Sequence, residues 1–240
     1  VTSLISPPRK VALERKHDHE MVIDASERMY ALLGQIGHGI LERAANSGII
    51  EKRWFGAMDG WVVSGQSDLV LSSQTLLDYK FTSVWTVKDG LKVEWIQQIN
   101  LLAWLAEAHA QPIKDAQIIC IFRDWSVLEA RRDPTYPQRQ VKVLPVPLWG
   151  WEKAEAFCRE RVRIHAMAQS GNGQLPECTA EERWEKSPKW AVMKKGRKRA
   201  VKLYDTEKEA IAHAMSEKLC HVEHRPGESV RCQSYCNAAP

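Results

Sequence analysis

The stretch that decides the fold is Trp61–Phe81, with the sequence WVVSGQSDLVLSSQTLLDYKF. Its apolar residues fall into short runs of β type, and one similar run precedes them. Glycines at 56, 60 and 65 and the pair Ser72-Ser73 separate these runs, and such residues commonly mark turns between strands. The pattern predicts an antiparallel meander built from Lys52–Phe55, Trp61–Ser64, Asp68–Leu71 and Thr75–Phe81.

Helical periodicity surrounds the meander on both sides. Apolar residues recur at helical spacing through Asp24–Ala45, Glu94–Ala110 and Trp149–Met167. The apolar run Ala116–Phe122 is typical of a strand covered on both faces. Gln140–Leu148 contains two prolines, which favours an edge strand. This order of elements predicts an α/β fold with a central mixed β-sheet flanked by helices.

A change in composition divides the chain. Gln169–Gln174 (QSGNGQ) has the residues of a flexible linker. Beyond it, Trp190–Lys194 and Arg199–Tyr204 flank a basic turn and predict a hairpin. A helix is expected from Asp205 to Lys218, and a strand pair at Val222–Arg231. We therefore expect a core domain at residues 1–170 and a small ββα appendage at residues 175–240.

Composition limits the class of protein without naming a function. Of 240 residues, 44% are hydrophobic and 27% charged, which is typical of a globular chain and excludes disordered and collagen-like proteins. No apolar run approaches the roughly 20 residues of a membrane span, and VTSLISPPRK lacks the apolar region of a signal peptide. The net charge of +4 is only a weak indication of polyanion binding. Six cysteines without an export signal predict thiols or metal ligands in a reducing cytoplasm.

Two carboxylates in the meander predict a cation site. Asp68 begins one predicted strand and Asp78 lies near the end of the next, so a tight hairpin brings them together. Paired carboxylates suit Mg²⁺ or Mn²⁺. Lys80 lies two residues after Asp78, so strand alternation puts both side chains on one face. The alternative is that the two aspartates flank a turn at the surface and Lys80 is solvated.

Two helical positions carry unexpected residues. His38 lies mid-helix among glycines at 34, 37 and 39, each of which weakens a helix by about 1 kcal/mol relative to alanine. Three such glycines indicate close approach by another backbone or a ligand, although a lone histidine here is also consistent with the core. Gln98 shares an apolar stripe with Leu102, where a surface amide is not expected.

Several of these residues occur together in the order of a known family. The patterns are GxxxHxxLE, GxxD, DYK and a helical glutamine, carried by Gly34, His38, Leu41, Glu42, Gly65, Asp68, Asp78, Tyr79, Lys80 and Gln98. Over roughly residues 1–125 the chain resembles the RecB-type branch of the PD-(D/E)XK nuclease superfamily, especially phage-encoded and CRISPR-associated exonucleases. The family's Q-x-x-x-Y motif is incomplete, because Leu102 stands at the tyrosine position.

This resemblance implies a site and an activity. The fold would be a restriction-endonuclease-like core. His38, Asp68, Asp78 and the backbone carbonyl of Tyr79 would bind Mg²⁺ or Mn²⁺. Lys80 would orient the attacking water, and Gln98 would lie near the DNA. The implied protein is a divalent-metal-dependent DNA exonuclease that hydrolyses phosphodiester bonds in phage-type recombination or repair.

The same resemblance implies a setting and leaves alternatives. Linear DNA ends are the expected substrate, in a bacterial or phage-infected cytoplasm and without membrane attachment. A recombination or single-strand-binding protein is the expected partner, and oligomerisation is compatible with the sequence. One alternative is a structure-specific endonuclease or resolvase with the same metal site. Another is a non-catalytic DNA-binding module.

The C-terminal region adds two candidate sites. Cysteines there are candidates for a soft metal, and the resemblance implies a [4Fe–4S] cluster, with Zn²⁺ or unliganded thiols as alternatives. These are Cys178, Cys220, Cys232 and Cys236, whereas Cys120 and Cys158 are expected in the core. Lys186–Lys202 contains eight basic residues and no acid, so it is either a solvated hairpin or a DNA contact. The DNA-contact candidates are Trp190, Lys194, Lys195, Arg197, Lys198 and Arg199.

Overall fold

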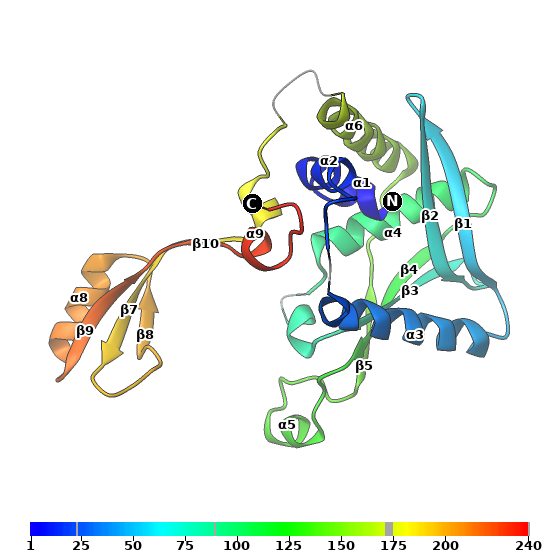
Figure 1. The fold of residues 1–240 in the computed structure, drawn as a ribbon. Helices are drawn as coiled ribbons and strands as arrows, with labels where there is room; N and C mark the ends of the chain where they lie inside the picture. The colour runs from blue at the N-terminus through cyan, green and yellow to red at the C-terminus, as the bar shows by residue number, and fades with distance from the viewer. Residues whose placement is uncertain (23, 89, 171–174, 240) are drawn as a thin grey trace. The chain divides into compact units, whose positions relative to one another are not determined.

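The computed structural model describes residues 1–22, 24–88, 90–170 and 175–239 (Figure 1). The chain forms two compact units. The first comprises Val1–Ser6 and Glu20–Gln174, and the second comprises Pro7–His19 and Leu175–Pro240. The division expected from the sequence placed residues 7–19 with the core, whereas the structure groups them with the C-terminal unit. Residues 171–174 of the predicted linker lie outside the described residues.

A five-stranded sheet of order β1-β2-β3-β4-β5 forms the centre of the first unit. Its β3–β4 pair is parallel and its other pairs are antiparallel. This confirms the predicted α/β fold with a mixed sheet and the edge position of the proline-containing strand. The strands are β1 (Ile49–Met58), β2 (Trp61–Val70), β3 (Thr75–Thr82), β4 (Asp115–Phe122) and β5 (Val141–Pro145).

The β1–β2 hairpin is longer than the sequence predicted. Asp59 and Gly60 form its two-residue turn with φ values of +48° and +81°, as an Asp-Gly hairpin turn favours. The predicted runs Lys52–Phe55, Trp61–Ser64 and Asp68–Leu71 are therefore not separate strands: all but Leu71, which follows β2, belong to two ten-residue strands.

Two glycines expected to break these strands instead lie inside them. A Cβ atom added to Gly65 would lie 2.5 Å from Leu102 Cδ2, and one added to Gly56 would lie 2.8 Å from Leu105 Cδ2. Both leucines belong to α4 (Val93–Glu107). These glycines thus permit close packing of a helix on the sheet, and they do not form turns.

Helices cover both faces of β3. Lys80 of β3 contacts Gln98 of α4, whereas its neighbour Phe81 contacts Gly37 of α3 (Met29–Ala44). Because adjacent strand residues point to opposite faces, α3 and α4 lie on opposite sides of this strand. Residues Ile99–Ala106 of α4 are all buried, and α6 (Trp151–Gln169) packs against α4.

Helix α3 buries an unexpected side. Asp24 caps the short 3₁₀ turn η1 (Ala25–Arg28) before it. The predicted close approach occurs at Gly37, where the Phe81 ring occupies the space of a Cβ, but nothing lies within 4 Å of a Cβ at Gly34 or Gly39. Five of the helix's large aliphatic side chains remain between 44% and 61% exposed, and they are Met29, Leu32, Leu33, Ile36 and Ile40.

Shorter elements complete the first unit. They are α1 (Thr2–Ile5), η2 (Val84–Val87) and α5 (Val127–Arg132). Cys120 of β4 and Cys158 of α6 are each 0% exposed, which confirms both as core residues. Among the described parts of the chain, no helix combines the length and apolar character needed to cross a bilayer.

The second unit contains a three-stranded antiparallel sheet of order β8-β7-β9, packed against one helix. The predicted ββα appendage is therefore incomplete, because a third strand joins it. The predicted strand pair at Val222–Arg231 is wrong: β9 pairs with β7, and β10 pairs with β6. The elements are α2 (Pro8–Lys16), α7 (Ala180–Arg183), β6 (Glu185–Lys186), β7 (Lys189–Lys194), β8 (Lys202–Tyr204), α8 (Glu207–Ser216), β9 (Cys220–Arg225), β10 (Glu228–Ser229) and α9 (Val230–Ser234).

Candidate functional site

His38 faces the junction of β2 and β3. Its ring lies edge-on to Tyr79 with centroids 6.3 Å apart and tilted against Phe81 at 6.0 Å, so β3 fixes its orientation. His38 Nδ1 lies 3.4 Å from Asp68 Oδ2, and the side chain is 33% exposed. The imidazole is therefore directed at a carboxylate where β2 meets β3.

Asp68 links the two strands of this junction. Its Oδ2 accepts a hydrogen bond of 2.7 Å from the backbone N–H of Tyr79, in addition to its contact with His38. The side chain is 12% exposed. The GxxD segment and the DYK segment are thus brought together, as the sequence predicted for the two aspartates.

Asp78 is buried beside a fixed ammonium group. Its side chain is 4% exposed, and its Oδ2 lies 2.7 Å from Lys80 Nζ. Lys80 also donates a 3.0 Å hydrogen bond to Gln98 Oε1, while Gln98 Nε2 lies 3.4 Å from Asp78 Oδ1. The amide of α4 therefore bridges the acid and the base, which accounts for a polar residue on an otherwise apolar helix.

The electrostatics of the site follow from burial and neighbouring charges. Burial raises the pKa of Asp78, and the adjacent Lys80 ammonium opposes that rise. The hydrogen bond with Asp68 raises the pKa of His38 against partial burial, and the charges of Asp68, Asp78 and Glu51 add to the rise. The charges at this site therefore act on one another over short distances, and they belong to His38, Glu51, Asp68, Asp78 and Lys80.

Glu51 is a member of this site that the sequence analysis missed. Among the described residues, only His38, Glu51 and Asp68 form a group of three whose potential ligand atoms all lie within 4.8 Å of one another. Asp78 is outside that group. A usable signal was present: the Asp-Gly turn pairs Met58 with Trp61, and counting back along the hairpin sets Glu51 opposite Asp68.

The donor set suits a hard divalent cation. Two carboxylates offer the oxygen ligands that Mg²⁺ and Mn²⁺ prefer, and the imidazole adds one nitrogen ligand. The buried Asp78 adds a further carboxylate near Asp68. The residues present therefore fit the predicted metal, with Glu51 in addition to His38, Asp68 and Asp78.

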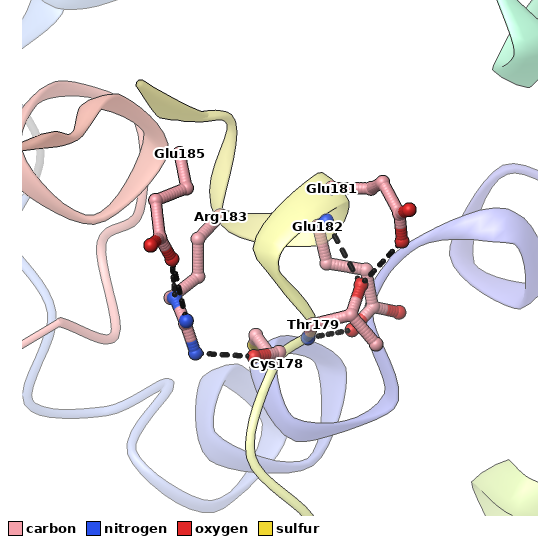
Figure 2. Close-up of polar contacts among 6 residues, drawn as sticks. All are labelled: Cys178, Thr179, Glu181, Glu182, Arg183 and Glu185. Atoms are coloured by element: carbon pink, nitrogen blue, oxygen red, sulfur yellow. Dashed lines mark hydrogen bonds and ion pairs between the residues drawn. The ribbon is translucent and has the colours of Figure 1, made fainter. Parts of the chain in front are cut away.

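The segment around Cys178 is held by several polar contacts (Figure 2). Arg183 Nη1 donates a 2.6 Å hydrogen bond to the Cys178 carbonyl and pairs with Glu185 at 2.6 Å through Nη2. Thr179 caps α7 with a capping box, in which the Thr179 hydroxyl accepts from the Glu182 N–H and the Glu182 carboxylate accepts from the Thr179 N–H. The backbone carrying Cys178 is thereby fixed in place.

Three of the four candidate cysteines lie in one region. Burial raises the pKa of the Cys178 thiol, and the negative charges of Glu182, Cys232 and Cys236 add to the rise. The Trp184 ring contacts Tyr235 edge-on at 5.4 Å, which joins α7 to the end of α9. No three cysteines in the described parts of the chain have sulfur atoms all within 4.8 Å of one another.

Cys220 lies elsewhere in the second unit. It begins β9 and pairs with Lys194 at the end of β7, and its thiol contacts Glu217 at 3.9 Å. Its nearest described partners are thus residues of the three-stranded sheet and the end of α8. This placement separates it from the region that contains the other three cysteines.

The basic turn between β7 and β8 is exposed. Lys195, Arg197, Lys198 and Arg199 all have exposed side chains, whereas Lys194 is half-buried and pairs with Glu217 at 3.3 Å. Four of the five predicted DNA-binding cations are therefore grouped in one exposed turn. The Lys194 ammonium instead has an acidic neighbour within the same unit.

Trp190, the predicted stacking residue, is half-buried. It pairs across the sheet with Tyr204, whose hydroxyl lies 3.1 Å from His213 of α8. Directly paired residues project from the same face, so Trp190 faces the helix side of the sheet. Its half-buried ring lies on His224 with centroids 4.5 Å apart. Trp190 thus contributes to packing within the second unit.

Comparison with known proteins supports the fold and leaves the activity open. No family model matches the chain, and no curated protein matches it. A solved structure described as "Crystal structure of SSO0001" is similar, with a TM-score of 0.50 and 20% sequence identity. The similarity covers 71% of this chain and 75% of that one. The chain therefore shares an α/β architecture with that structure.

Proposed function

We propose that this protein is a Mg²⁺- or Mn²⁺-dependent deoxyribonuclease that acts as an exonuclease on linear DNA. The observation that supports this proposal best is the convergence of His38, Asp68, Asp78 and Lys80 where β2 and β3 meet, with Gln98 joining the last two. These are the residues that carry the resemblance to RecB-like nucleases. Exonuclease activity is favoured because that group contains end-processing enzymes.

The acidic residues and His38 would hold the cation against the phosphate. When bound, a divalent cation lowers the pKa of a water and neutralises charge on the phosphate. Asp68 is held by the Tyr79 N–H and His38, so its carboxylate is oriented before any ligand arrives. Asp78 is fixed by burial and by Lys80. Preorganised donors of this kind reduce the reorganisation needed during reaction.

Lys80 would position the attacking water and stabilise developing negative charge. Its ammonium lies between the Asp78 carboxylate and the Gln98 carbonyl oxygen, which limits its motion. Gln98 therefore acts on the reaction through the position of Lys80. This role adds to the position near the DNA that the family's motif implies.

The exposed basic turn of the second unit would add affinity for the DNA backbone. Lysine and arginine side chains there can contact phosphates and release counterions. This contribution to affinity does not depend on the base sequence of the DNA. Mutation of the catalytic aspartates would therefore remove cleavage but leave much of the binding.

We further propose that Cys178, Cys232 and Cys236 bind a metal group, either a [4Fe–4S] cluster or Zn²⁺. Their grouping supports this proposal, and the separate position of Cys220 excludes it from our ligand set. Anaerobic purification followed by absorbance near 400 nm and metal analysis tests it. Iron with that absorbance indicates the cluster, zinc without it indicates Zn²⁺, and neither metal contradicts the proposal.

We place the activity in phage-type DNA recombination or repair in the cytoplasm, with a recombination or single-strand-binding partner. End-labelled linear DNA and closed circular DNA, incubated with Mg²⁺ or Mn²⁺, test the nuclease proposal. Degradation of linear DNA alone is expected, and nicking of circles would indicate an endonuclease. Asp78→Asn should abolish cleavage but retain binding. Asp115→Asn, at the exposed start of β4, is the matched control and should cleave normally.

A further inference from the structure

We propose that Glu51 is a metal ligand and that, with His38 and Asp68, it forms a cation position separate from the one beside Asp78. The inference rests on the proposed function only in requiring a divalent cation at this site. Cleavage of DNA is not needed for it. Asp68 would then lie between two cation positions and serve both.

The spacing of the three groups fits one small cation. Their ligand atoms all lie within 4.8 Å of one another, so a central point is within about 2.8 Å of each atom, close to the roughly 2.0–2.6 Å of Mg²⁺ and Ca²⁺ ligands. Small rotations of the carboxylates would close this difference. Asp78 is not part of this group and is engaged instead by Lys80 and Gln98.

The hairpin places Glu51 and holds its side chain. Glu51 lies opposite Asp68 in the β1–β2 register, between the pairs Ile50–Leu69 and Lys52–Ser67. The Gln66 amide donates to Glu51 Oε2. Because a carboxylate has two oxygens, this contact leaves Oε1 for a cation.

Gln66 is itself positioned by a neighbour on the same strand pair. Arg53 Nη2 donates a 3.0 Å hydrogen bond to Gln66 Oε1. The amide of Gln66 therefore presents its N–H group to Glu51. This arrangement orients the carboxylate without neutralising its charge.

The charge balance of the site also favours a cation between Glu51 and Asp68. Lys80 neutralises Asp78 at 2.7 Å. Asp68 and Glu51 receive hydrogen bonds from a neutral backbone N–H and a neutral amide, and the titratable His38 is the further basic group that contacts Asp68. A divalent ion between Glu51 and Asp68 would relieve the repulsion between them.

Several classes of phosphodiesterase bind two cations that share one carboxylate, with the two metals about 3.5–4 Å apart. Here Asp68 is the shared carboxylate, with His38 and Glu51 on one side and Asp78 on the other. Glu51 would thus set the number of cations that the site binds.

Manganese binding to the full chain tests the inference directly. Mn²⁺ is titrated into wild type and Glu51→Gln, with calorimetry for stoichiometry and electron paramagnetic resonance for coupling between neighbouring Mn²⁺ ions. We expect two Mn²⁺ and a coupled signal in wild type. Glu51→Gln should bind one Mn²⁺ normally, bind the second at least about tenfold more weakly, and lose the coupled signal.

Two further variants separate the outcomes. Glu107→Gln, at the exposed end of α4, removes a carboxylate far along the chain from the site and should behave as wild type. Asp78→Asn should weaken Mn²⁺ binding at the position beside Asp78. Binding at the position formed by His38, Glu51 and Asp68 should be retained. Wild-type binding by Glu51→Gln, or a single Mn²⁺ in wild type, would overturn the inference. Absence of DNA cleavage together with the expected Mn²⁺ results would refute the nuclease proposal alone.

Discussion

Replacement of Lys80 by methionine isolates the ion pair on which the candidate site depends. The Lys80 Nζ–Asp78 Oδ2 distance is 2.7 Å, and the side chains are 21% and 4% exposed. Breaking a buried ion pair by removing one partner costs about 3–5 kcal/mol. The isolated carboxyl can instead bind a proton, which limits the loss because the buried charge is then removed. Because Lys80 is partly solvated, we expect Lys80→Met to lose about 2–4 kcal/mol of unfolding free energy at pH 7.

The pH dependence of this loss has a definite sign. Burial raises the pKa of Asp78 in the folded chain above its unfolded value. A group with a raised folded pKa contributes stability below the unfolded pKa, and that contribution is lost as pH rises through the folded pKa. Without Lys80 the folded pKa of Asp78 rises further. The destabilisation by Lys80→Met should therefore be large at pH 7 and small near pH 4.

Urea unfolding in EDTA, followed by circular dichroism, measures both effects without interference from metal. The double variant Asp78→Asn/Lys80→Met provides the control, because a neutral amide replaces the buried charge at nearly the same volume. It should regain most of the stability that Lys80→Met loses. Equal midpoints for wild type and Lys80→Met at pH 7, or a double variant as unstable as the single one, would refute the reasoning.

Three further predictions concern packing, thiol chemistry and DNA affinity. Gly37→Ala should destabilise the chain by about 1–3 kcal/mol, because the added Cβ would lie 2.1 Å from a ring atom of Phe81. Gly34→Ala should stabilise the chain by about 0.5–1 kcal/mol, because nothing lies within 4 Å of its Cβ and alanine favours a helix. Thermal unfolding shifts of the same sign for the two variants would contradict this reasoning. Burial raises the pKa of Cys120 and of Cys158 to about 11, so neither should react with a thiol reagent at pH 8 in the native chain, as mass spectrometry of labelled peptides can check. Alanine in place of the basic residues at 195–199 should lower the slope of log DNA affinity against log salt by about 0.9 for each lost phosphate contact, and an unchanged slope would exclude this turn from the interface.

The sequence by itself determined the elements whose signals are local. The Asp59-Gly60 turn, the apolar helix α4 and the buried strand β4 follow from turn chemistry and hydrophobic periodicity, which act over a few residues. The residues of the candidate site were also named correctly as neighbours, because Asp68 and Asp78 occupy adjacent strands. Spacing along a strand was sufficient to pair Lys80 with Asp78.

Only the tertiary structure decided the features that depend on distant segments. The local sequence around the glycines at 56 and 65 fits either a turn or the interior of a strand. The packing of α4 against these glycines selects the strand. Glu51 joins the site because the full length of a hairpin places it opposite Asp68, a relation that no short motif records. Strand β9 pairs with β7, which precedes it by one strand and one helix, and not with its neighbour β10. The sequence did not predict this choice, because the backbone hydrogen bonds that join strands are the same for most residue types. Local chemistry thus selected the elements, while long-range packing selected their partners.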